Sequence, residues 1–107
     1  MEMNKYQEGA LETAIYPEQH RVIYPALGLA GEAGEVADKV KKILRGDSEL
    51  TDGKKLDIAM EIGDVLWYCA TLSHDLGFTL DQVAQMNYAK LKSRQERGKL
   101  GGNGDNR

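Results

Sequence analysis

Two long segments of this 107-residue chain repeat apolar side chains every three or four residues, the spacing of one face of an α-helix. The first segment begins with Pro25 in its first turn and ends before Gly46. The second runs from about residue 54 to residue 76, before Gly77. Pro suits a first helical turn and Gly suits a left-handed C-terminal cap. We therefore predict two long amphipathic helices with apolar stripes at Leu29, Ala33, Val36, Val40, Ile43 and Leu44, and at Ile58, Ile62, Val65, Cys69, Leu72 and Leu76.

Two shorter segments complete an all-α prediction. Asn4 and Gln7 have the spacing of a capping box for a helix that runs to about residue 13. Thr79 and Gln82 have the same spacing at the start of a helix that ends near Arg97. No stretch of strand length alternates apolar and polar residues. The expected architecture is one domain, residues 1–107, built as an antiparallel helical bundle of about four helices.

Size and charge limit the partners of such a domain. Stripes this continuous exceed what one short protomer can cover, which favours a homo-oligomer. The net charge of -3 argues against a nucleic-acid or membrane-surface partner. No segment approaches the ~20 apolar residues that span a bilayer, and the polar start does not resemble a signal peptide. The lone Cys69 reads as a packed thiol, so we expect a cytoplasmic, reducing location.

Each long helix carries a pair of acids at the same place relative to its apolar stripe. Taking about 100° per residue, Glu32 and Glu35 lie about 60° and 120° from the first stripe residue of their helix. Glu61 and Asp64 lie at the same two angles on the other helix. If the helices pack antiparallel through their stripes, four carboxylates can converge at one edge of the interface. The alternative is that each pair is solvated on a separate surface.

Convergence of these acids requires positive charge. Two bare carboxylates ~4 Å apart repel by about 4 kcal/mol at a partly buried site, and a small domain is stable by only ~5–15 kcal/mol. Ligands that are all oxygen suit Mg²⁺ or Mn²⁺. Neither His20 nor His74 lies three residues after a glutamate, so the motif of di-iron bundles is missing. A hard cation held by acids alone points to a polyphosphate substrate.

At these positions the sequence resembles the MazG-type nucleoside triphosphate pyrophosphohydrolases, all-α enzymes related to dimeric dUTPases. Their signature is ExxE, an interval, and ExxD; here it reads "EAGE" at 32–35, 25 residues, and "EIGD" at 61–64. The preceding "LGLAG" and the later "NYAKLKSR" extend the resemblance from about residue 25 to residue 97.

The resemblance implies hydrolysis of (deoxy)nucleoside triphosphates between the α and β phosphates, which releases a monophosphate and pyrophosphate and clears non-standard or surplus nucleotides. It implies that Glu32, Glu35, Glu61 and Asp64 hold Mg²⁺, with Mn²⁺ as a substitute. One of these acids, or a water held by one, would deprotonate the attacking water. The resemblance further implies dimers or tetramers with active sites near subunit contacts.

Four further residues are candidates for binding substrate. Lys90 and Arg94 lie one turn apart, so both can reach one phosphate chain, and family members use basic residues in this region for the triphosphate. Asn87 lies one turn before Lys90 and Tyr68 one turn after Asp64, where the resemblance allows contact with the nucleotide. A solvated helix end would equally explain the cations, and packing would explain the tyrosine.

Other residues are assigned to packing, the surface or the tail. Lys39 and Lys42 share the flank of the first acid pair, where surface pairing four residues apart explains them. The alternatives are that they neutralise the acids or contact phosphate. Trp67 lies opposite its stripe, which predicts packing against another helix or subunit. The Gly-rich tail, residues 98–107, is expected to be flexible or ordered by ligand, with Lys99 and Arg107 able to fold over phosphates.

Two rival functions stay open at this point. One is a dUTPase-like or dCTPase-like enzyme of narrow base specificity. The other is a non-catalytic helical domain that binds nucleotide or a protein partner, with acids that merely solvate one face. The shape of the base pocket decides the first question, and a saturable Mg²⁺ site decides the second.

Overall fold

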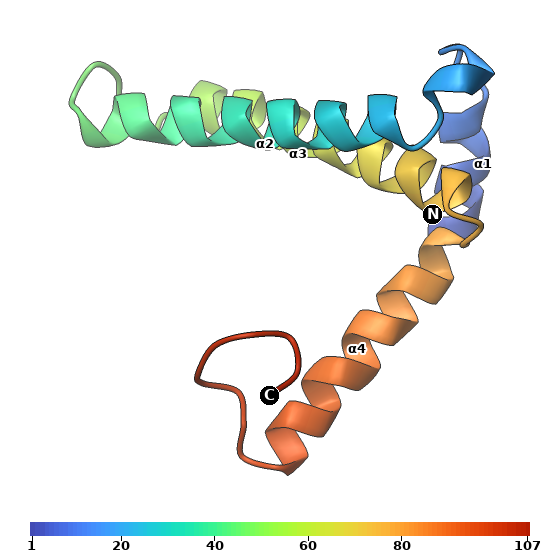
Figure 1. Cartoon of the computed structure of the whole chain (residues 1–107). Coiled ribbons are helices and arrows are strands. Elements are labelled where there is room, and N and C mark those ends of the chain that lie inside the picture. The colour runs from blue at the N-terminus through green and yellow to red at the C-terminus, as the bar shows by residue number, and fades with distance from the viewer.

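The structure, a computed structural model, describes residues 1–107 and confirms the all-α prediction. It has four α-helices, one turn of 3-10 helix and no strand (Figure 1). The elements are α1 (Met3–Leu11), η1 (Glu18–His20), α2 (Ile23–Leu44), α3 (Asp52–Asp75) and α4 (Leu80–Glu96).

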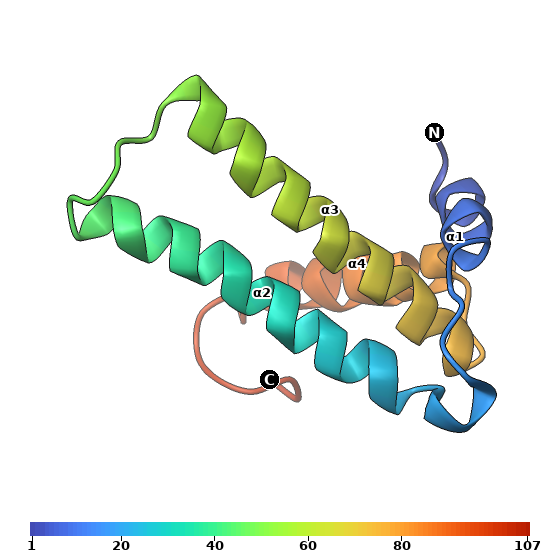
Figure 2. The ribbon, with the colours of Figure 1, turned by 90° about the horizontal axis from the view of Figure 1, so that it is seen from above.

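The α2–α3 pair forms an antiparallel hairpin that is the longest part of the molecule. Both views show the two helices running side by side (Figures 1 and 2). Pro25 is buried in the first turn of α2, as predicted. Gly46 and Gly77 follow α2 and α3 with φ values of 91° and 88°, a left-handed conformation that glycine adopts without strain. The sequence signals at these helix ends are therefore confirmed.

The capping prediction for α4 is confirmed, whereas the one for α1 is wrong. Thr79 and Gln82 form a complete capping box at the start of α4. At the start of α1, by contrast, Glu2 is the N-cap residue and its side chain makes no capping hydrogen bond. Asn4 lies inside α1, and its Oδ1 accepts a hydrogen bond of 3.0 Å from the backbone N–H of Asp81 in α4.

Gln7 also lies inside α1, where it fastens that helix to the joint between α3 and α4. Its side chain is buried, and its Nε2 donates to the carbonyl oxygens of Ala70 at 3.0 Å and Phe78 at 3.2 Å. Its Oε1 accepts from the backbone N–H of Leu80 at 3.0 Å. Asn4 and Gln7 therefore hold other helices in place instead of capping their own.

The hydrophobic core is small and sits at this joint. Its buried apolar residues are Ala10, Ala70 and Leu80. Trp67 packs against them from α3, and its Nε1 donates a 2.8 Å hydrogen bond to Oγ1 of Thr13. The prediction that Trp67 packs against another part of the fold is therefore confirmed. Half-buried Cys69 packs against the same core, and burial raises the pKa of its thiol, which disfavours the nucleophilic thiolate.

The fourth helix leaves the α2–α3 hairpin at an angle. Its first turns pack on α1 and α3, and its distal part stands clear of α2 (Figure 1). The radius of gyration is 16.5 Å, compared with about 13 Å for a compact chain of this length. None of the helices combines the length and the apolar character needed to cross a membrane.

Candidate functional site

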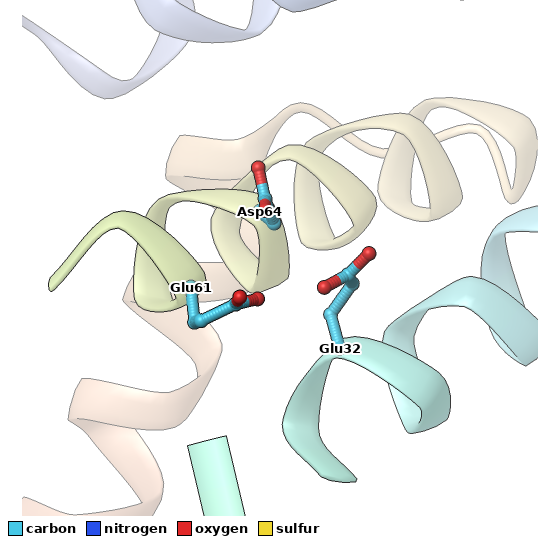
Figure 3. A group of neighbouring side chains, drawn as sticks. All are labelled: Glu32, Glu61 and Asp64. Carbon is cyan, nitrogen blue, oxygen red and sulfur yellow. The ribbon is translucent and has the colours of Figure 1, made fainter. Parts of the chain in front are cut away.

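Three of the four predicted acids converge where α2 crosses α3. Glu61 and Asp64 lie nearly one turn apart on α3, and the antiparallel packing brings Glu32 of α2 opposite them (Figure 3). One carboxylate oxygen from each residue lies within 4.8 Å of the others. Glu32 and Glu61 are half-buried and Asp64 is exposed. The group is thus accessible to solvent at Asp64.

The fourth acid, Glu35, stays outside this group in the structure. It is exposed and lies nearly one turn after Glu32 along α2. Its side chain faces a polar pocket of about 270 Å³ between α2, the loop that follows it and α3. The residues that line this pocket are Glu35, Asp38, Lys39, Lys42, Asp47, Ser48 and Lys54.

The electrostatics of the acid group favour an additional positive charge. A hydrogen bond with Glu61, followed by burial and the charge of Asp64, raises the pKa of the Glu32 carboxyl. Closely spaced carboxylates raise one another's pKa because they cannot all ionise freely. Lys39 supplies one compensating charge, with its Nζ 3.9 Å from Oε1 of Glu61. This contact crosses between helices, so Lys39 neutralises an acid of the group, which is one of the alternatives to surface pairing, while Lys42 pairs with Asp38 four residues earlier on α2.

The donor set suits a hard divalent cation. Three carboxylates from two rigid helices offer only oxygen ligands, and neither sulfur nor imidazole belongs to the group. Such ligands fit Mg²⁺ or Mn²⁺ better than zinc. A divalent ion would also relieve the mutual repulsion that raises the pKa of Glu32. By the chemistry of its ligands, the group therefore fits the predicted metal.

Tyr68 lies beside the acids, between the two helices. Burial is the main cause that raises the pKa of its phenol, and Glu32 and Asp64 both contribute through their charges. Its ring occupies the space next to Gly28 of α2: a Cβ atom at Gly28 would lie 2.2 Å from Cε1 of Tyr68. Gly28 is thus the residue that lets this ring sit between the helices beside the acids.

A row of aromatic rings leads from the acids to the connector before α2. Tyr24 lies next to Tyr68, with ring centroids 6.3 Å apart, and stacks on Tyr16 at 4.8 Å. Sequence reasoning missed Gly28 and Tyr24, although they lie one and two turns before Glu32. That spacing, mirrored by Tyr68 one turn after Asp64, is the signal that could have found them.

Asp75, at the end of α3, fixes the connector that carries Tyr16. Its carboxylate accepts hydrogen bonds from the Tyr16 hydroxyl at 2.8 Å, the Val22 N–H at 2.9 Å and Arg21 Nε at 3.3 Å. Val22 has a φ of 71°, a strained value for a β-branched residue. Burial and the bond to Asp75 raise the pKa of Tyr16 to about 12. Asp75 therefore holds a strained turn and one end of the aromatic row.

The structure leaves the remaining substrate candidates on a separate part of the chain. Asn87 is exposed, and Lys90 and Arg94 lie further along α4, where the helix stands away from the α2–α3 hairpin (Figure 1). Both cations contact Asp105 of the tail. One chain thus does not bring them to the acids.

Comparisons with known proteins agree with the sequence motif. The family model described as the MazG nucleotide pyrophosphohydrolase domain matches residues 24–98. The chain is 46% identical to the "Gene 37 protein" of Mycobacterium phage L5, over an alignment of 114 positions that covers all of both chains. No solved structure matches the chain significantly. The matched segment contains the acids, Tyr68 and the cations of α4, and it ends at Gly98, the first residue of the tail.

Proposed function

Because the chain belongs to the MazG nucleotide pyrophosphohydrolase family, we propose that it hydrolyses (deoxy)nucleoside triphosphates to the monophosphate and pyrophosphate. The proposed cofactor is Mg²⁺, with Mn²⁺ as a substitute, and the proposed role is to clear non-standard or surplus nucleotides. The observation that carries the proposal is the convergence of Glu32, Glu61 and Asp64 within 4.8 Å.

The proposed site assigns the cation to the acids of the two long helices. Glu32, Glu61 and Asp64 would hold it, and Glu35, exposed one turn further along α2, would complete the ligand set. When bound, Mg²⁺ would neutralise charge on the phosphate oxygens and lower the pKa of the attacking water. One of the four carboxylates, or a water held by one of them, would accept the proton of that water.

The triphosphate is assigned to side chains of α3 and α4. Tyr68, between the helices and next to the acids, would contact the nucleotide, while Lys90, Arg94 and Asn87 would bind the phosphate chain. Since one chain keeps α4 away from the acids, we propose that a second copy of the chain completes the site.

A homodimer, or a tetramer of paired dimers, also accounts for the apolar surface of one protomer. Leu27 of α2 is 70% exposed and Met60 of α3 is 68% exposed. Exposed large apolar side chains on several helices of a single protomer are typical of an interface between subunits.

We propose free nucleotides in the cytoplasm as the substrate, with neither nucleic acid nor a membrane as a partner, consistent with the net charge of -3.

A panel of triphosphates tests this function. Purified protein is incubated with each ribo- and deoxynucleoside triphosphate and Mg²⁺, and the products are separated by chromatography. We expect monophosphate and pyrophosphate, and a loss of at least about 100-fold in turnover for Glu61→Gln and Asp64→Asn. The control is Glu49→Gln, which removes an exposed acid of the α2–α3 loop.

The same panel separates the rival functions. Turnover of dUTP or dCTP alone would show a narrow base specificity. Release of no pyrophosphate from any triphosphate, by a protein that still binds nucleotide, would overturn the proposed hydrolysis and favour a non-catalytic domain.

A further inference from the structure

The C-terminal tail folds back along α4 as a closed loop (Figure 1). The guanidinium group of Arg107 lies inside this loop and donates hydrogen bonds to its backbone. Glycines of the loop adopt positive φ values that other residues rarely reach. The carbonyl oxygens that accept from Arg107 belong to Lys99, Leu100, Gly101 and Gly104.

The loop places Asp105 on the two cations of α4. Oδ1 of Asp105 lies 3.2 Å from Nζ of Lys90 and 3.4 Å from Nη2 of Arg94. The same Nη2 donates to the backbone oxygen of Asp105 at 2.8 Å. Arg97 adds a further bond, from Nη1 to the backbone oxygen of Arg107 at 2.8 Å. The tail thus presents oxygen atoms to the residues that we assign to the triphosphate.

The tail provides hydrogen-bond acceptors for only some of the donors of Lys90 and Arg94. Arg94 is 4% exposed, and its Nε is buried without a hydrogen-bond partner. An arginine carries five N–H donors in a planar fork, and a buried donor without a partner costs free energy. A phosphate chain offers more oxygens, with more charge, than one carboxylate and a few carbonyl groups. The site is therefore built for a larger anion than the one that occupies it.

We propose that the tail is a built-in competitor of the substrate, whose Asp105 carboxylate holds Lys90 and Arg94 until a phosphate chain displaces it. This inference rests on the proposed function, which assigns these two cations to the triphosphate. Only molecules with a released tail bind the phosphate chain, so the apparent affinity is the intrinsic affinity multiplied by the fraction of molecules whose tail is released. The same factor applies to every ligand that uses the two cations. Mg²⁺ binding at the acids of α2 and α3 stays unchanged.

Titration of the full-length protein with inorganic tripolyphosphate, without Mg²⁺, tests the competition. We expect Asp105→Asn to lower the dissociation constant about three- to tenfold, the effect of removing one exposed carboxylate from its cations. The matched control is Glu96→Gln, which changes the net charge equally at an exposed position of α4 that makes no ion pair.

A second variant separates competition from a general charge effect. Arg107→Ala removes a positive charge, which by itself weakens the binding of an anion. It also removes the hydrogen bonds that close the loop, so the proposal predicts tighter binding of tripolyphosphate. A direct readout is the backbone mobility of Gly101, Gly102 and Gly104 by heteronuclear NMR relaxation. These amides should be restrained in the ligand-free protein and mobile after tripolyphosphate is added.

Each outcome bears on a different proposal. Equal dissociation constants for the wild type and both variants would overturn the competition and leave the proposed function intact. A tail that is already mobile in the ligand-free wild type would do the same. Failure of every variant to bind tripolyphosphate would overturn the assignment of Lys90 and Arg94 to the phosphates, and the competition with it.

Discussion

Gly28 shows how one residue sets the geometry of the acid group. It lies one turn before Glu32, and the ring of Tyr68 fills the space that a side chain would need. Because both ends of this contact belong to the helices that carry the acids, the spacing of the acids depends on it. A larger residue at this position must push the helices apart or expel the ring.

We predict that Gly28→Ala destabilises the protein by about 1–3 kcal/mol and weakens Mg²⁺ binding, since overpacking displaces the helices. Gly9→Ala is the matched control, because nothing lies within 4 Å of a Cβ atom at this helical position. It should stabilise the protein by about 0.5–1 kcal/mol through helix propensity. Denaturant unfolding and metal titration measure both effects. Equal stability of the two variants would contradict the assigned contact.

A pH-dependent prediction concerns Asp75. Its burial opposes ionisation, but the hydrogen bonds from Val22, Tyr16 and Arg21 hold the pKa of the carboxyl below its usual value of 3.8. A lowered pKa in the folded state gives stability that is present above the ordinary pKa and lost as the pH falls through the lowered one. The wild type should therefore have a larger free energy of unfolding than Asp75→Asn near neutral pH. This difference should decrease below about pH 4.

We expect the free energy of unfolding of the wild type to exceed that of Asp75→Asn by about 1–3 kcal/mol at pH 7, because the amide can accept fewer of the three hydrogen bonds. Thermal unfolding of the wild type and Asp75→Asn between pH 7 and pH 3 measures it. Asp81→Asn, on the exposed first turn of α4, is a control with the same chemical change. A difference that stays constant down to pH 3 would show that the Asp75 carboxylate is not the group responsible.

At the residue scale, the sequence predicted the position of each acid around its helix axis better than the distances between side chains of different helices. The helical wheel placed Glu32, Glu61 and Asp64 on facing flanks, and the structure brings them within 4.8 Å. A wheel carries no information on how closely two helices approach, so it missed the contact of Gly28 with Tyr68. For the same reason it could not show that Lys39 reaches across to Glu61.

Among the helices, α1 stabilises the connection between α3 and α4 by hydrogen bonds from its side chains. Gln7 binds three backbone groups of that joint, and Asn4 binds the N–H of Asp81 at the start of α4. The direction of α4, and with it the position of Lys90 and Arg94, is set at this joint. Two side chains of a short helix thus fix the orientation of a long one.

We predict that Gln7→Ala lowers the free energy of unfolding by at least about 2 kcal/mol, because it leaves buried backbone groups without partners. Asn4→Ala should cost about 1 kcal/mol, as the loss of an N-terminal cap does. Gln19→Ala, at an exposed position of η1, is the control. Denaturant unfolding at one fixed protein concentration measures all three. A change below about 0.5 kcal/mol for Gln7→Ala would contradict the claim that Gln7 holds α1 on the connection between α3 and α4.

For the helices, the sequence correctly predicted the capping box whose two residues bond to each other's backbone within one turn. It failed for α1, where the hydrogen-bond partners are distant along the chain. Thr79 and Gln82 formed their capping box because both members lie in one turn. Asn4 and Gln7 have the same spacing, yet their partners lie more than 60 residues away along the chain. The tertiary contacts replaced the local ones because they satisfy backbone groups that would otherwise be buried alone.

The molecule as a whole buries few apolar residues. The buried apolar core consists of Ala10, Ala70 and Leu80, and large apolar side chains of every helix are exposed. Small domains are marginally stable even when they are compact, and this one is extended. Contacts with other copies of the chain would supply the missing burial.

We predict a mass of at least twice the 11.9 kDa of one chain in sedimentation equilibrium at micromolar concentration. Met60→Lys places a charge on the exposed apolar face of α3 and should shift the equilibrium toward smaller species, with a loss of turnover. Gln19→Lys adds the same charge at an exposed polar position. A wild-type protein that is monomeric and fully active would contradict a site shared between subunits.

The sequence predicted the fold class and left the arrangement of its outer parts open. The stripes and caps indicated the α2–α3 hairpin because each helix buries its own periodic face. The direction of α4 and the path of the tail depend on contacts that follow no periodic pattern. The guanidinium group of Arg107, for example, closes the tail loop by binding its backbone carbonyl groups, and no pattern in the sequence indicates these contacts.

Calorimetric titration of the metal-free protein with Mg²⁺ tests the central claim, that facing carboxylates of α2 and α3 form a divalent-cation site. We predict one saturable binding process in the wild type and in Glu49→Gln, and its loss in Glu61→Gln. The absence of saturable heat in the wild type, or equal binding by Glu61→Gln, would contradict it.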